Sequence, residues 1–147
     1  MDEKRTRYAE ERVLIGTIDR GQDLLERITA IVNDEGIEVG RVEVFGSVES
    51  LVITRHDQMT RFPTEDRISV GCDIISLAGP VSLFKRRALP RLHGLFVEPE
   101  GRLHGGLLAL GTRTHACEVV ITSYSGRKLT RDFDPETGLP LWKNARL

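Results

Sequence analysis

The sequence predicts an α+β fold, a mostly antiparallel β-sheet with one main α-helix. Three observations predict it: one segment repeats its apolar residues with a helical period, most of the chain after Gly36 alternates with a period of two, and Gly/Pro turns separate the alternating segments. The chain has 147 residues, the size of one domain, and its 29% of charged residues is typical of globular proteins. We expect an exposed N-terminal arm over residues 1–11 and a single domain over residues 12–147.

The expected helix follows a strand and a polar break. Arg12–Ile18 is rich in β-branched residues and predicts a strand, which ends where Asp19 to Gln22 interrupt it. Asp23 is suited to cap the N-terminus of a helix, and Gly36 is suited to the left-handed residue that ends one. The apolar stripe between them consists of Leu24, Leu25, Ile28, Ile31 and Val32.

The rest of the chain predicts strands separated by turn residues. We expect strands over residues 39–48, 51–55, 68–77, 81–84, 92–97, 103–110, 115–124, 128–133 and 139–142. Gly79-Pro80 predicts a turn, and Pro63 makes the segment 61–67 a turn or an edge. One helix cannot cover so many strands, so we expect the sheet to close on itself or a second subunit to cover it.

Charge and cysteine content exclude several classes of protein. Lys and Arg total 21 and Asp and Glu total 22, which excludes nucleic-acid binding by bulk charge alone. Cys72 and Cys117 form no zinc motif, and we favour two reduced, buried thiols over a single disulfide. The charged N-terminus has no apolar segment, and no stretch approaches the roughly 20 residues that cross a bilayer. We therefore expect a cytoplasmic protein with no signal peptide and no membrane partner.

Four stretches, taken together in this order, resemble one protein family. They are RGQDLLERITAIVNDEGI, RVEVFGSVES, RLHGLFVEPEGRLHGGLL, and ACEVVIT followed by FDPETGL. Over residues 12–140 the chain resembles the plant and prokaryote conserved (PPC) domain, which plants fuse to AT-hooks and which stands free in bacteria and archaea. The resemblance implies a fold similar to that of the acetolactate decarboxylases, assembly as a homotrimer, and a DNA-binding or regulatory function.

The resemblance also bears on metal binding. Prokaryotic members of the family show H-x-H on a central strand and then G-G-H, and the three imidazoles bind a divalent metal. The matching residues here are Arg91, His93 and Leu107, so the resemblance implies a degenerate metal site. We therefore expect no cofactor, and the alternative is a zinc site built from His93, His104 or His115 with a carboxylate.

Arg91 beside His93 predicts a different ligand. A guanidinium next to an imidazole favours a carboxylate or phosphate group. A small-anion-binding protein or an enzyme would then use a pocket around Arg91, His93 and Glu118, with Arg91 holding the anion and His93 acting as acid or base. The alternative is an ion pair between Arg91 and Glu118 or another acid that only stabilises the fold.

The densest positive cluster is the candidate DNA-binding segment. It consists of Lys85, Arg86 and Arg87, and Arg127, Lys128 and Arg131 would extend it. A short basic run is also typical of a solvated turn, and the sequence contains no R-G-R-P core, helix-turn-helix or zinc finger. DNA binding is thus an implication of the family resemblance, which these residues alone do not establish.

Overall fold

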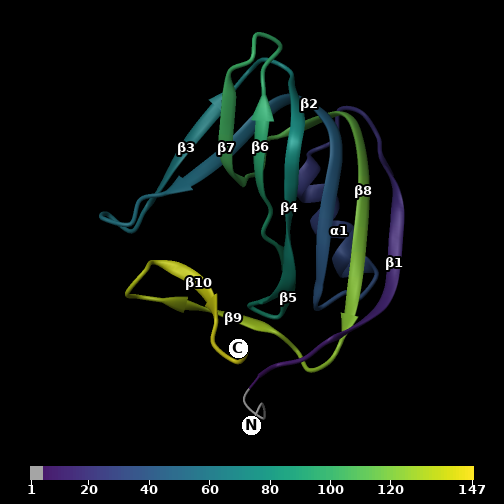
Figure 1. Ribbon diagram of the computed structural model, residues 1–147, viewed down its shortest axis with the longest axis vertical. Helices are drawn as coiled ribbons and strands as arrows, with labels where there is room; N and C mark the ends of the chain where they lie inside the picture. The colour runs from purple at the N-terminus through teal and green to yellow at the C-terminus, as the bar shows by residue number, and fades with distance from the viewer. Residues whose placement is uncertain (1–4) are drawn as a thin grey trace.

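The computed structural model describes residues 5–147, so residues 1–4 of the expected N-terminal arm lie outside the described residues. One α-helix and ten β-strands form within this range (Figure 1). In chain order they are β1 (Ala9–Ile18), α1 (Leu24–Asp34), β2 (Gly40–His56), β3 (Pro63–Ile68), β4 (Cys72–Phe84), β5 (Arg87–Pro90), β6 (His93–Val97), β7 (Leu103–Leu108), β8 (Arg113–Ser125), β9 (Thr130–Asp134) and β10 (Leu139–Trp142). The fold is α+β, as the sequence predicts.

Helix α1 has the caps that the sequence predicts. The Asp23 carboxylate accepts a hydrogen bond from the backbone N–H of Glu26 at 3.1 Å, which satisfies one of the free donors of the first turn. Gly36 has a φ of +66°, the left-handed conformation that follows many helices. The buried residues of the helix are Leu24, Ile28 and Val32.

Two predicted interruptions of the strands are wrong. Residues 39–55 were expected to form two paired strands, and they lie instead in the single strand β2. Strand β4 runs through Gly79-Pro80 without turning, because the glycine serves a close approach of two backbones. A Cβ at Gly79 would lie 1.8 Å from the carbonyl oxygen of Arg91. Strand β1 also begins at Ala9, inside the segment expected as an arm.

The sheet closes partly on itself. Its strand order is β1-β8-β2-β7-β6-β4-β9-β10, with β3 paired to β2 and β5 to β4. Strand β2 pairs with β4 over residues 40–48 and with β7 at Ile53 and Thr54. Because β6 joins β7 to β4, the strands β2, β7, β6 and β4 form a closed ring.

The core lies between α1 and the curved sheet (Figure 1). Cys72 and Cys117 belong to it as free thiols, and burial raises the pKa of both. The opposite face of β6, β4 and β2 carries no helix among residues 5–147, and His93 is exposed there.

The helix of the described residues is too short and too polar to span a lipid bilayer.

Candidate anion-binding site

Two arginine side chains and one histidine side chain line up along one face of β4. The residues of β4 that share this face are Ala78, Pro80 and Ser82. His93 pairs with Ala78. The backbone N–H of Arg91 donates to the carbonyl oxygen of Pro80 at 3.0 Å, and Arg131 Nε donates to the hydroxyl oxygen of Ser82 at 3.0 Å. We call Arg91, His93 and Arg131 the cationic cluster.

Arg131 is held rigidly. Its side chain donates to Ser82 Oγ and to the carbonyl oxygen of Pro140, the latter at 2.9 Å, and the residue is only 9% exposed. The guanidinium carbon lies 4.7 Å from the centre of the Trp142 ring, and the indole N–H of Trp142 donates to the same Ser82 oxygen at 2.9 Å. The hairpin of β9 and β10 thus presents a pre-oriented guanidinium to the open face of β4.

Arg91 has no counter-charge among residues 5–147. Its half-buried side chain makes no hydrogen bond or ion pair to any residue between 5 and 147. The acid nearest in register on this face is Glu43, which pairs with Ala78 and is already bonded to Arg41 at 2.9 Å. Arg91 therefore keeps its charge and its donors available to a ligand.

The cluster perturbs the pKa values of its members. Burial lowers the pKa of His93, and the charges of Arg91 and Arg131 lower it further, so His93 is neutral at pH 7. Burial lowers the pKa of Arg91. Burial and the charge of Arg91 lower the pKa of Arg131 to about 10, so both arginines stay charged. Two positive charges therefore lie close together in a partly desolvated environment, where a bound anion would stabilise the folded protein.

The structure does not bring Glu118 to this cluster. Glu118 lies on β8, where it pairs with Phe45 of β2 and Thr17 of β1. Strands β4 and β2 stand between β6, which carries His93, and β8. The alternative ion pair between Arg91 and Glu118 is wrong, because within the described chain Arg91 forms no ion pair.

The residues at the family's metal positions do not fit a metal ion. Leu107 lies directly opposite His93 in the β6–β7 pair, so the register places the third position beside the second. Arg91 repels a cation and Leu107 supplies no donor atom. His93 is thus the one residue at the three positions that can bind a metal ion.

The other histidines do not replace the missing ligands. His104 pairs with the buried Phe96, which places it on the opposite sheet face from His93, and its Nε2 lies 2.6 Å from a Glu98 oxygen. His115 lies on β8, with Nδ1 2.8 Å from Ser47 Oγ. No group of three or more metal-ligating side chains occurs in residues 5–147. The alternative zinc site is wrong because the three histidines lie on separate parts of the sheet.

The predicted basic segment forms the turn between β4 and β5. Lys85 and Arg86 are the two turn residues, with φ of 50° and 69°, and Phe84 pairs with Arg87 beneath them. A two-residue hairpin turn of this kind requires positive φ and is usually Asn-Gly, so this turn is strained. Lys85, Arg86 and Arg131 also line a cavity of about 500 Å³.

Sequence reasoning placed Arg131 in a solvated basic patch and read Ser82 only as a strand residue, and both lie buried against Trp142. One signal was available. The predicted strands 128–133 and 139–142 and the turn between them already indicate a hairpin that brings the end of the chain back beside Arg131, and in the structure Trp142 pairs with Arg131. The local sequence does not indicate which face of the sheet this hairpin covers.

Fold and site together define an α+β protein with two charged arginines on one face of its sheet. The sequence profile of the Plants and Prokaryotes Conserved (PCC) domain matches residues 5–125, and the chain belongs to this family, abbreviated PPC above. The predicted family resemblance is confirmed. Among curated proteins, none matches the sequence.

Several solved structures share the fold over nearly the whole chain. A metal-containing protein from Archaeoglobus fulgidus is 29% identical, with a TM-score of 0.89, and the match covers 95% of this chain and 98% of that one. A PPC protein from Pyrococcus horikoshii is 23% identical, with a TM-score of 0.89 and 96% and 97% coverage. A candidate DNA-binding protein from Bacteroides thetaiotaomicron is 20% identical, with a TM-score of 0.84 and 95% and 99% coverage.

Proposed function

We propose that this PPC-domain protein is a binding module that holds a carboxylate or phosphate group of its ligand between Arg91 and Arg131, beside His93. The observation that carries the proposal is the pair of guanidinium groups without a carboxylate partner among the described residues. Arg131 is pre-oriented by Ser82 and Trp142, which lowers the entropy cost of binding. An anion would offset the repulsion between the two arginines.

Thermal unfolding in phosphate tests this function. Inorganic phosphate and acetate should raise the melting temperature relative to chloride at equal ionic strength. At an anion concentration a hundred times the dissociation constant, the free energy of unfolding should increase by about 2.7 kcal/mol. Arg91→Ala should lose this gain, and Arg102→Ala, at an exposed position on the β6–β7 turn, should retain it. The absence of any shift in the wild-type protein with either anion would refute the proposal.

A second candidate function is binding of DNA through the basic turn. Lys85 and Arg86 occupy strained positions that Asn and Gly would fill more easily, and strain of this kind is often kept at functional sites. The Bacteroides structure described as a candidate DNA-binding protein shares the fold. The contact would be to phosphates and sensitive to salt, because the turn offers cations and no groove-reading element.

A turn-preserving variant tests DNA binding. Lys85→Asn with Arg86→Gly removes two charges and suits the turn better, so the protein should become more stable while its affinity for duplex DNA falls. The slope of log affinity against log salt should become shallower by about 2. The control variant, Arg102→Gln with Arg113→Gln, removes two charges elsewhere and should change neither the stability nor the affinity for duplex DNA. Wild-type protein that binds no duplex even at low salt would exclude this function.

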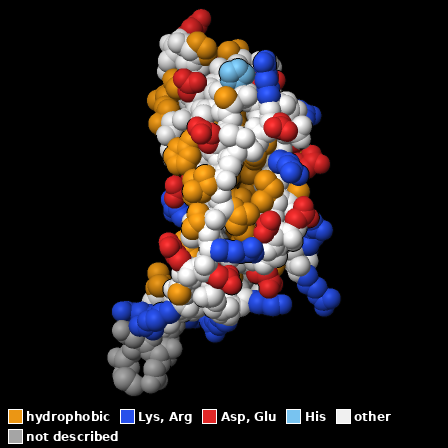
Figure 2. Space-filling view, turned by 90° about the vertical axis from the view of Figure 1, so that its right-hand side faces the viewer, with side chains coloured by type: hydrophobic (Ala, Val, Ile, Leu, Met, Phe, Trp, Pro, Cys, Tyr) orange, Lys and Arg blue, Asp and Glu red, His pale blue; other side chains and the backbone are white. Residues whose placement is uncertain are grey.

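We further propose that the chain assembles as a homotrimer. Strand β1 is an edge of the sheet, and it carries exposed Val13 and Ile15, which are 51% and 78% accessible. Hydrophobic side chains gather among charged ones on the side of the molecule where β1 lies (Figure 2). Light scattering should give three times the chain mass, and Ile15→Lys should lower it. A monomeric wild-type protein would contradict the trimer.

A further inference from the structure

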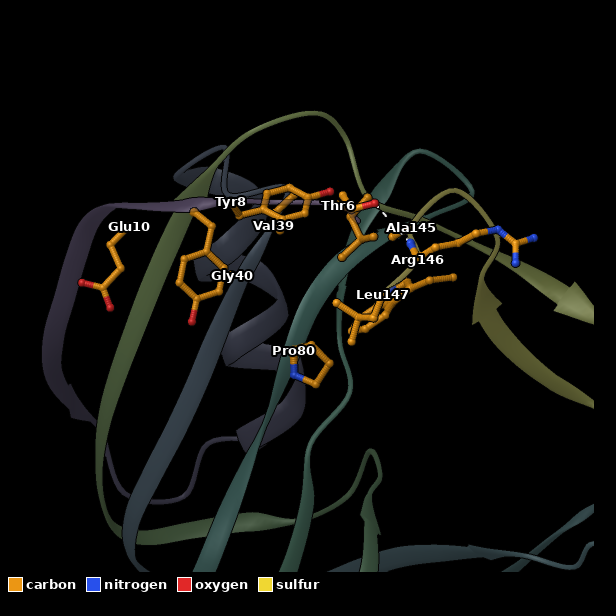
Figure 3. Close-up of a pocket in the computed structure, with 12 residues that line it drawn as sticks. Thr6, Tyr8, Glu10, Val39, Gly40, Pro80, Ala145, Arg146 and Leu147 are labelled. Atoms are coloured by element: carbon orange, nitrogen blue, oxygen red, sulfur yellow. Dashed lines mark hydrogen bonds between the residues drawn. The ribbon is translucent and has the colours of Figure 1, made fainter. Parts of the chain in front are cut away.

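An apolar cavity adjoins the cationic cluster. Its volume is about 600 Å³, within the range of small-molecule sites. The two ends of the described chain form one of its walls, where the backbone N–H of Arg146 donates to the hydroxyl oxygen of Thr6 at 3.1 Å (Figure 3). Its apolar lining includes Val39, Pro80, Leu129, Trp142 and Leu147.

The cavity and the cluster share a wall. Pro80 and Trp142 line the cavity. The carbonyl oxygen of Pro80 accepts a hydrogen bond from the backbone N–H of Arg91, and the guanidinium of Arg131 lies over the ring of Trp142. Each of the two arginines therefore contacts a residue of the cavity wall, and neither arginine is itself part of the lining.

Tyr8 gives an independent indication of a ligand. It lines the cavity, and its hydroxyl group is buried without a hydrogen-bond partner in the described chain. Buried hydroxyl groups nearly always have a partner, because leaving one unpaired costs free energy. Because the hydroxyl group is buried, a polar atom of a bound molecule would supply that partner once the ring shifts toward the cavity.

We infer that the ligand is a small amphipathic acid, with a carboxylate or phosphate at Arg91 and Arg131 and an apolar body of aromatic size in the cavity beside Trp142. This inference rests on the proposed anion site and names the class of ligand. Neither a free inorganic anion nor a neutral apolar molecule would use both parts of the site.

Three probes separate the two parts of the site. Calorimetric titration would compare acetate, naphthylmethanol and naphthoate, which carry the charge alone, the apolar body alone and both. Naphthoate should bind at least about tenfold more tightly than either of the others, because burial of its rings adds to the charge contact. Equal binding of acetate and naphthoate would overturn the inference and leave the anion site in place. No binding of any of the three would refute the anion site as well.

Two variants test which residues bind the charged group of the ligand and which bind its apolar body. Arg91→Gln should reduce naphthoate affinity to that of naphthylmethanol. Ala145→Phe fills the cavity from its wall and should reduce naphthoate affinity to that of acetate, whereas Ala116→Phe, at an exposed site on β8, should change neither. Light scattering on Ala145→Phe gives a second readout. A change in its mass with unchanged naphthoate affinity would show that a second copy of the chain fills the cavity, and would overturn the inference.

Discussion

Replacing Arg91 by Gln should stabilise the ligand-free protein. The side chain of Arg91 makes no hydrogen bond or ion pair to residues 5–147, so its removal breaks no contact of that kind. Its charge acts on Arg131, whose pKa is lowered to about 10 by burial and, second, by the charge of Arg91. At 1.36 kcal/mol per pH unit, that fall corresponds to about 3 kcal/mol against the charged form of Arg131.

The share of Arg91 in this cost sets the expected effect. Burial is the larger cause, so the charge of Arg91 accounts for less than half, roughly 1 kcal/mol. For a chain of this size, about 1 kcal/mol raises the melting temperature by roughly 2–4 °C. The rise should shrink as ionic strength increases, because salt screens the repulsion.

Differential scanning calorimetry measures this effect, in a buffer without phosphate or carboxylate and at one protein concentration. Arg41→Gln is the matched control, because Arg41 lies on the same sheet and is paired with Glu43. That variant should be unchanged or slightly less stable. A fall of several degrees in Arg91→Gln would refute the reasoning, since it would show that Arg91 makes a favourable contact in the unliganded protein.

Three further predictions concern the same face and its hairpin. Arg91→His with Leu107→His should place three imidazoles on one face and create zinc binding, seen as a stoichiometric metal content that His93→Ala removes. In an NMR titration His93 should have a pKa below 6.5, and Arg91→Gln should raise it because a neighbouring positive charge is removed. Hydrogen bonds from Thr137 and Lys143 lower the pKa of Asp134, so its stabilisation of the β9–β10 hairpin is present above pH 3.8 and is lost as the pH falls through the lower folded value. Hydrogen exchange of β10 should accelerate over that acid range and should already be fast at neutral pH in Asp134→Asn.

Features with a local cause could be predicted from the sequence. Helix α1 follows from the period of its apolar residues and from its cap at Asp23, because both act within a few residues. The β9–β10 hairpin follows from its turn, and its last strand has the predicted bounds. The proposal of a site at Arg91 and His93 also came from the sequence, through the departure of Arg91 from the family pattern.

The partners of those residues depend on contacts between distant segments, which the local pattern does not encode. The sequence suggested Glu118 because acid and base types were present, but pairing places two strands between β6 and β8. The tertiary structure brings Arg131 to the cluster, because the β9–β10 hairpin packs beside β4 and buries its guanidinium against Ser82 and Trp142. Strand alternation determined which face each side chain takes, and only the order of strands in the sheet decided which charges meet there.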